Sequence, residues 1–197
     1  MQKIFETFIE TYLADKVGIS EHFISNTLSK QLKANLLTLF AKNELVTAGT
    51  GNENFILKDI EIRSDKIYWL DKSHDNPHEN AFFALMDDFV QYLNETCYTG
   101  ITSYEFHYAM YEKGSFYKRH LDRFRNDDRR LFSMITYLNA DWQEGDGGEL
   151  SIFHDDGQTQ NISPTNGKSV FFKSDELEHE VLKTIVPRMS ITGWLRR

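Results

Sequence analysis

Three residues of this sequence carry side chains that commonly bind metal ions, and two of them are neighbours in the chain. His120 and Asp122 are two residues apart, and His179 lies far downstream. In an extended segment residues i and i+2 point to the same face, so the imidazole and the carboxylate would converge. Two His and one carboxylate form the ligand set of an open iron(II) site. The sequence therefore predicts a metal site made by His120, Asp122 and His179.

A second group of residues is suited to bind an anion beside this metal site. Arg188 and Thr192 share one face if their segment is a strand. A buried guanidinium needs an anionic partner, and its fork matches a carboxylate. If that anion is 2-oxoglutarate, its far carboxylate would lie on Arg188, and Tyr137 could donate a second hydrogen bond. The alternatives are a surface salt bridge between Arg188 and Glu178 or Glu180, and plain core packing for Tyr137.

Other classes of protein use similar ligands. Sets of two His and one carboxylate also bind zinc, so a zinc hydrolase is an alternative. That enzyme would need a general base and would have no use for a carboxylate pocket at Arg188. A non-catalytic binding module is a further alternative, although binding folds have no need of open iron positions. The four-part spacing favours the iron site over three unrelated surface groups.

The first half of the chain is predominantly helical by its apolar spacing. We expect an amphipathic helix near residues 4–13, a second helix capped by Ser20, and a third capped by Asn80. Residues 71–80 are polar and contain Pro77, which indicates an exposed loop able to close over a substrate. Within this loop His74 and His78 are expected to be surface residues, because Pro77 disfavours a helix that would align them on a metal.

Strands dominate the second half. From about Thr102 apolar residues alternate with polar ones, and we expect strands at 131–138, 149–153, 169–172, 179–185 and 189–195. An earlier hairpin is expected around residues 60–70, and Asn166-Gly167 is typical of a type I′ hairpin turn. Helices followed by many short strands indicate an α+β fold, with helices on one face of a β-sandwich or jelly roll.

Composition limits the range of partners. The chain has 197 residues, an ordinary size for one domain, and a net charge of −8, which opposes binding to nucleic acid or anionic membranes. Cys97 is the only cysteine, so no intrachain disulfide can form, which fits a reducing compartment. No signal peptide or long apolar run is present. We expect a soluble, cytoplasmic protein.

Several motifs resemble one family. Tyr111, His120-Leu121-Asp122, His179 and Arg188 resemble the iron(II)- and 2-oxoglutarate-dependent dioxygenases of the prolyl 4-hydroxylase superfamily. The resemblance is closest to the oxygen-sensing prolyl hydroxylases of animals and their bacterial relatives. It extends over most of the chain and is carried also by these segments: Ile62-Arg63-Ser64-Asp65-Lys66-Ile67-Tyr68-Trp69, Thr136-Tyr137-Leu138-Asn139-Ala140-Asp141-Trp142, Gly147-Gly148-Glu149-Leu150 and Arg188-Met189-Ser190-Ile191-Thr192-Gly193-Trp194.

The resemblance implies a fold and a set of roles. It implies a double-stranded β-helix (jelly-roll) core at residues 101–197, supported by helices and first strands at 1–100, in a single domain 1–197. It implies His120, Asp122 and His179 as iron ligands. Arg188 and Tyr137 would hold 2-oxoglutarate, with Tyr111 and Thr192 beside it; O2 and ascorbate are further expected cofactors. Glu112-Lys113 follows Tyr111 where relatives tend to carry Pro and Gly, which leaves the local loop geometry open.

The resemblance also implies a reaction. The expected activity is hydroxylation of a prolyl residue of a protein, with release of succinate and CO2. The alternative within the same class is a 2-oxoglutarate oxygenase acting on a free amino acid or another small molecule. Arg130, within a stretch of mixed charge, and Trp194 are candidates for substrate contact.

Overall fold

The computed structural model describes residues 2–49, 61–122 and 129–197. Three helices, a short 3-10 helix and eleven strands follow one another within these ranges. In chain order they are α1 (Gln2–Asp15), β1 (Val17–Ser20), α2 (Asn26–Ala41), β2 (Val46–Thr47), β3 (Lys66–Trp69), η1 (Lys72–His74), α3 (Pro77–Cys97), β4 (Ser103–Tyr111), β5 (Tyr117–His120), β6 (Arg130–Tyr137), β7 (Leu150–Phe153), β8 (Thr159–Ile162), β9 (Ser169–Lys173), β10 (Glu178–Val181) and β11 (Arg188–Arg196).

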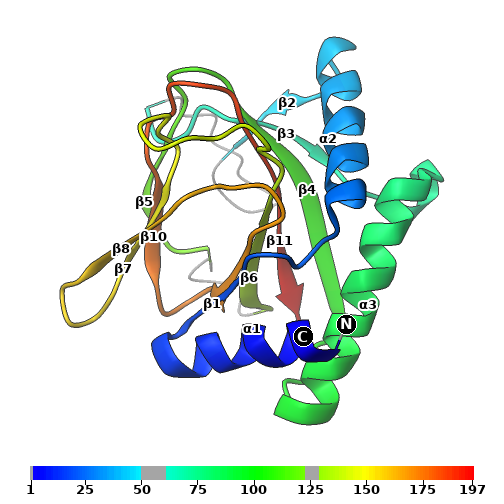
Figure 1. The fold of residues 1–197 in the computed structure, drawn as a ribbon, viewed down its shortest axis with the longest axis vertical. Helices are drawn as coiled ribbons and strands as arrows, with labels where there is room; N and C mark the ends of the chain where they lie inside the picture. The colour runs from blue at the N-terminus through cyan, green and yellow to red at the C-terminus, as the bar shows by residue number, and fades with distance from the viewer. Residues whose placement is uncertain (1, 50–60, 123–128) are drawn as a thin grey trace.

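Two antiparallel sheets form the β-rich part of the fold. The larger sheet has the strand order β1-β9-β6-β11-β4-β3-β2, and the smaller one has the order β5-β10-β7-β8. Figure 1 shows the smaller sheet facing the larger one, with α2 and α3 on the far side of the larger sheet. This arrangement confirms the predicted α+β class and jelly-roll architecture.

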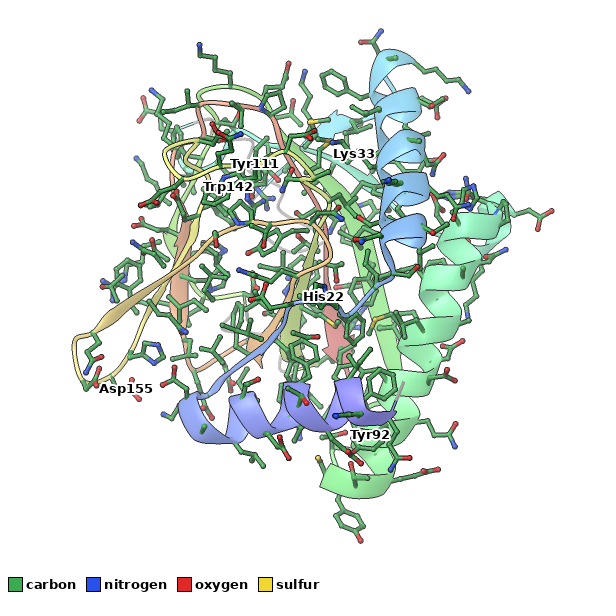
Figure 2. All side chains as sticks on the ribbon, in the orientation of Figure 1. His22, Lys33, Tyr92, Tyr111, Trp142 and Asp155 are labelled. Carbon is green, nitrogen blue, oxygen red and sulfur yellow. The ribbon has the colours of Figure 1, made fainter. Side chains whose placement is uncertain are left out.

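Side-chain alternation along the larger sheet creates two cores. On β4, Phe106 and Met110 pack with the helices, whereas Ala109 and Tyr111 face the smaller sheet (Tyr111 is labelled in Figure 2). β6 and β11 alternate in the same way, so one row of each strand is directed into the space between the sheets. The residues predicted to bind the anion come from this inner row. Of the predicted metal ligands, His120 and His179 lie on the facing small sheet, and Asp122 lies just beyond β5. Ile191, on the other face of β11, packs with the helices instead.

The start of the second helix was predicted wrongly. Ser20 does not cap a helix but ends β1, which pairs with β9 from Val17↔Phe172 to Ser20↔Ser169. The helix α2 begins at Asn26, and its N-cap is Ser25, whose hydroxyl accepts a hydrogen bond from the Leu28 amide. Pairing with a strand distant in sequence therefore overrode the local capping signal.

The start of the third helix was also predicted wrongly. α3 begins at Pro77, not after Asn80, and Asn76 is its N-cap. Proline is favoured at the first helical position because its missing N–H has no partner there in any case. The expected loop 71–80 therefore consists of η1 and the first turn of α3. In it His74 lies 3.1 Å from the buried carboxylate of Glu79.

The expected turn at Asn166-Gly167 does not form a hairpin. Gly167 has a positive φ of 80°, but Asn166 does not, so the turn is not type I′. The strands before and after it, β8 and β9, belong to different sheets. Of the hairpin expected at residues 60–70, only β3 forms in the described part, and Ile60 lies outside the described residues. No described helix is long and apolar enough to cross a membrane.

Candidate metal and cosubstrate site

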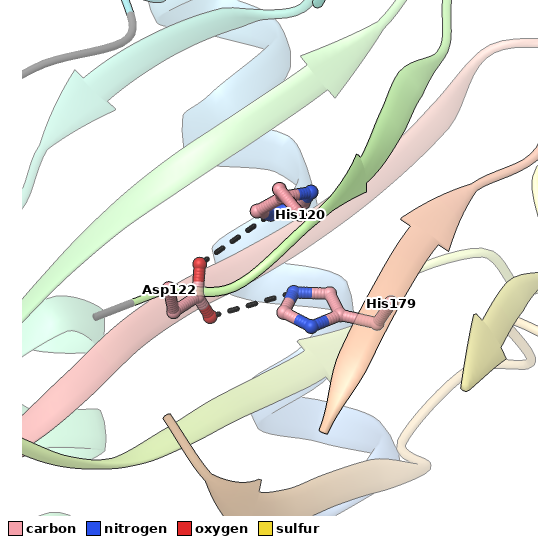
Figure 3. A group of neighbouring side chains, drawn as sticks. All are labelled: His120, Asp122 and His179. Atoms are coloured by element: carbon pink, nitrogen blue, oxygen red, sulfur yellow. Dashed lines mark ion pairs between the residues drawn. The ribbon is translucent and has the colours of Figure 1, made fainter. Parts of the chain in front are cut away.

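The fold brings His120, Asp122 and His179 together. His120 and His179 are register partners on the adjacent strands β5 and β10, and Asp122 follows β5 directly. The His120 Nε2 and the Asp122 Oδ1 are 3.5 Å apart, and the His179 Nε2 and the Asp122 Oδ2 are also 3.5 Å apart. One ligand atom from each residue lies within 4.8 Å of the others. Figure 3 shows the two rings converging on the carboxylate, an arrangement that can hold one metal ion.

Backbone carbonyls fix the orientation of both imidazoles. The Nδ1 of His120 is 2.7 Å from the Lys118 carbonyl oxygen, and the Nδ1 of His179 is 3.1 Å from the Leu177 carbonyl oxygen. A carbonyl can only accept, so each Nδ1 carries a proton and each Nε2 is the ring nitrogen available to a metal. Such anchoring of the second ring nitrogen is typical of histidines that bind metals.

The charges of the cluster also suit a cation. Burial by itself would raise the pKa of Asp122, but the His179 and His120 rings and the Ser133 hydroxyl lower it below its usual range. Burial lowers the pKa of His179 to about 4, against the attraction of Asp122. At neutral pH the carboxylate is therefore charged and His179 is neutral, which are the states that bind iron(II).

Arg188 lies in the same pocket as the cluster. Its side chain is buried, and its Nε donates to the Gly148 carbonyl oxygen at 2.8 Å. Its guanidinium carbon lies 4.8 Å from the ring centre of Tyr111 and 5.0 Å from that of Tyr137. Among the described residues no carboxylate pairs with this guanidinium, so the surface salt bridge with Glu178 or Glu180 is not formed. Glu178 pairs instead with Arg119.

The Tyr137 hydroxyl is buried and has no hydrogen-bond partner among the described residues. Burial raises the pKa of Tyr137, and the nearby positive charge of Arg188 only partly opposes this rise. The hydroxyl is therefore protonated and able to donate. A buried guanidinium without an anion and a buried hydroxyl without an acceptor are both costly unless a ligand satisfies them. A carboxylate of a bound ligand could satisfy both groups. Arg188 and Thr192 line the pocket that contains the metal cluster.

The two candidates for substrate contact lie next to one another. Trp194 lines the pocket, and its indole Nε1 is buried without a partner among the described residues. The Arg130 guanidinium carbon lies 3.5 Å from the centre of the Trp194 ring. Arg130 also forms an ion pair with Glu105 at 2.9 Å, which holds its guanidinium in place against the Trp194 ring. Of the mixed-charge stretch around Arg130, residues 123–128 lie outside the described residues.

Sequence reasoning missed several residues of the pocket. His107 was not among the candidate site residues, but it lines the pocket and its Nδ1 is buried without a partner among the described residues. Arg63 also lines the pocket and forms a two-point ion pair with the buried Asp65 at 2.8 and 2.6 Å. Tyr117 stacks on His120, with ring centres 3.5 Å apart. The alternation of β4 was the available signal for His107, since it shares a face with Tyr111.

The comparisons with known proteins agree with this geometry. The model of the 2OG-Fe(II) oxygenase superfamily matches residues 106–196. A crystallised prolyl-4-hydroxylase from Pseudomonas putida is 35% identical, with a TM-score of 0.88 over 98% of each chain. A prolyl hydroxylase from Trichoplax adhaerens, solved in complex with a hypoxia inducible factor peptide fragment, shares the fold at 21% identity. Its TM-score is 0.86 over 99% of this chain and 90% of that chain.

An animal protein is similar over a shorter region. The hypoxia-inducible factor prolyl hydroxylase of Caenorhabditis elegans is 31% identical over 165 residues, which are 79% of this chain. The chain spans only 22% of the length of that relative. Because the Pseudomonas enzyme aligns along almost the whole chain at 35% identity, the resemblance seen in the motifs is confirmed, and the chain belongs to the 2OG-Fe(II) oxygenase superfamily as a prolyl 4-hydroxylase-like dioxygenase.

Proposed function

We propose that this enzyme hydroxylates a prolyl residue of a protein or peptide, converting 2-oxoglutarate to succinate and CO2. The observation that carries the proposal is the end-to-end similarity to a prolyl-4-hydroxylase, at 35% identity over 98% of both chains. The zinc hydrolase alternative is set aside, because the chain belongs to an iron- and 2-oxoglutarate-dependent family.

In this proposal the three clustered residues hold iron(II). His120 and His179 offer their Nε2 atoms, and Asp122 offers a carboxylate that would lower the net charge of the site. Three ligands on one side leave positions open for 2-oxoglutarate and O2. Bound iron(II) and 2-oxoglutarate together supply the oxidising chemistry that the side chains lack.

The far end of 2-oxoglutarate is held by residues of the larger sheet. Arg188 on β11 would bind its carboxylate with the guanidinium fork, and Tyr137 on β6 would donate to the same carboxylate. Tyr111 lies against the Arg188 guanidinium and limits its movement. Apolar residues around the metal cluster, among them Ile135 and Val181, exclude water from the reacting groups.

Two pocket atoms that have no hydrogen-bond partner among the described residues support a peptide substrate. The Trp194 Nε1 can only donate, and it needs an acceptor such as a carbonyl oxygen. The His107 Nδ1 beside it also lacks a partner among the described residues. A prolyl residue within a peptide has a carbonyl oxygen but no N–H. We therefore assign Trp194 and His107 to the substrate end of the pocket, with Arg130 supporting Trp194.

A peptide assay tests the proposal. Purified enzyme is incubated with iron(II), 2-oxoglutarate and a library of proline-containing peptides, and mass spectrometry measures oxygen gain on proline together with succinate. The proposal expects equal amounts of hydroxyproline and succinate, and neither product with the Asp122→Ala variant. Oxidation of free amino acids but of no peptide would favour the small-molecule alternative. Turnover is also compared with and without ascorbate, whose participation stays a prediction.

A further inference from the structure

Two buried serine hydroxyls lie behind the carboxylate of Asp122. The Ser133 Oγ on β6 is 2.6 Å from the Asp122 Oδ2, and it is 2.9 Å from the Oγ of Ser174. Both serines are fully buried. Strand pairing sets their positions, because Ser133 faces Phe172 across β6 and β9, and the amide of Ser174 donates to the Leu131 carbonyl.

The direction of these hydrogen bonds follows from the contact with Asp122. The Ser133 Oγ is the donor to the Asp122 Oδ2, because a carboxylate oxygen accepts from a hydroxyl at this distance. The single hydroxyl proton of Ser133 must then point to Asp122, and Ser133 must accept from Ser174. The two hydroxyls form a chain that donates toward the carboxylate, and each bond in such a chain strengthens the other.

The orientation of the Asp122 side chain depends on these two hydroxyls, whereas the two histidines are oriented by the backbone. His120 and His179 lie on paired strands, and each ring is anchored through its Nδ1. Asp122 lies beyond the end of β5, so no described strand ladder fixes its side chain. The Arg130 guanidinium donates to its carbonyl oxygen at 3.2 Å, which fixes the backbone but not the carboxylate.

We propose that Ser133, supported by Ser174, is a positioning residue that turns the Asp122 carboxylate so that Oδ1 alone binds the metal. Each carboxylate oxygen lies 3.5 Å from one histidine Nε2, Oδ1 from that of His120 and Oδ2 from that of His179, but only Oδ2 accepts from the Ser133 hydroxyl. Binding through one oxygen keeps a coordination position open that a two-oxygen carboxylate would fill. This inference rests on the ligand set of the proposed function, but not on the identity of the substrate.

The chain provides a matched control on the same two strands. Thr136 and Ser169 are register partners on β6 and β9, and their hydroxyl oxygens are 2.7 Å apart. Both residues are buried, like Ser133 and Ser174. Neither hydrogen-bonds to the metal cluster among the described residues. Ser169→Ala therefore removes a buried hydroxyl from the same sheet without touching Asp122.

The test measures metal binding in Ser133→Ala, Ser174→Ala, Ser133→Thr and Ser169→Ala. The Kd for iron(II) is measured without oxygen by competition with a chelator, and the visible spectrum of bound cobalt(II) reports the ligand geometry. We expect Ser133→Ala to weaken iron(II) binding about 10- to 100-fold, the usual effect of removing a partner of a metal ligand. Ser174→Ala should weaken it less, Ser133→Thr should keep the wild-type Kd, and Ser169→Ala should leave both Kd and spectrum unchanged.

The outcomes separate this inference from the proposed function. If Ser133→Ala and Ser174→Ala bind iron(II) as Ser169→Ala does, with the same cobalt(II) spectrum, the positioning role is wrong. If Asp122→Ala keeps the wild-type Kd, the ligand assignment itself is wrong. Should Ser133→Ala fail to fold, Ser174→Ala decides the question, because it leaves Ser133 in place.

Discussion

Replacing Tyr137 with Phe should change protein stability and 2-oxoglutarate affinity in opposite directions. In the absence of ligand the Tyr137 hydroxyl is buried without a partner among the described residues. An unsatisfied buried hydroxyl costs roughly 1–3 kcal/mol, so its removal should leave the free energy of unfolding unchanged or raise it by about 1 kcal/mol.

Binding of 2-oxoglutarate should suffer from the same change. A hydrogen bond to a charged carboxylate contributes about 1.5–3 kcal/mol. Each 1.4 kcal/mol is a factor of about ten in Kd, so Tyr137→Phe should weaken 2-oxoglutarate binding roughly 10- to 150-fold. Iron(II) affinity should not change, because Tyr137 is not among the metal-binding residues.

Urea unfolding of the metal-free protein and calorimetric titration of the manganese(II) form with 2-oxoglutarate provide the two values. Tyr108→Phe is the matched control, because the Tyr108 hydroxyl is equally buried but accepts from the Asn35 side chain at 3.2 Å. That variant should lose about 0.5–1.5 kcal/mol of stability and keep its 2-oxoglutarate affinity. The reasoning is refuted if Tyr137→Phe is destabilised as Tyr108→Phe is, or if its affinity for 2-oxoglutarate is unchanged.

Three further predictions concern the surroundings of the site. Gly148→Ala should weaken 2-oxoglutarate binding measured by calorimetry, because the added Cβ would lie 3.0 Å from the Arg188 Cδ. The control Gly145→Ala also has a positive φ, but its Cβ would have no heavy atom within 4 Å, so it should keep the affinity. Equal affinities of the two variants would contradict this prediction. Burial and the charge of Arg63 lower the pKa of His107 to about 3, so between pH 6.5 and 3 the unfolded chain binds more protons than the folded one. The free energy of unfolding should therefore fall as the pH falls, by up to about 1.4 kcal/mol per pH unit. His107→Gln should reduce this slope in urea unfolding at pH 7 and pH 5, and an unchanged slope would count against a neutral buried imidazole. Glu178→Gln breaks the exposed ion pair with Arg119 and should change the free energy of unfolding by about 1 kcal/mol or less. The Kd for iron(II), measured by chelator competition, should not change. A large loss of iron(II) affinity would make Glu178 a metal ligand.

The metal cluster could be predicted from sequence because its spacing has a direct geometric meaning. His120 ends β5 and Asp122 lies two residues beyond it, so the i, i+2 spacing of an extended segment was enough to predict that the two side chains converge. The strands β4, β6 and β11 were likewise predicted from local alternation, which placed Arg188 and Thr192 on one face. These features depend only on neighbouring residues, so they can be predicted from the sequence without knowing the rest of the fold.

The features that escaped prediction depend on contacts between distant segments. Val17–Ser20 is a short segment that becomes strand β1 only because β9 lies beside it. Thr159–Ile162 is mostly polar, and it forms β8 by pairing with β7. The support of Asp122 by Ser174 arises from two segments that only the sheet brings together. No local pattern distinguishes Ser174 from any other serine after a strand.

The most direct test of the account is the visible absorption of the iron(II) protein when 2-oxoglutarate is added without oxygen. If iron(II) is held by the three residues and 2-oxoglutarate binds it, the complex would show a charge-transfer band. We predict this band for the wild-type protein, its absence in His179→Ala and Asp122→Ala, and a higher 2-oxoglutarate requirement in Tyr137→Phe. A wild-type protein without the band, or an Asp122→Ala variant that keeps it unchanged, would contradict the assignment of His120, Asp122 and His179 as the iron ligands.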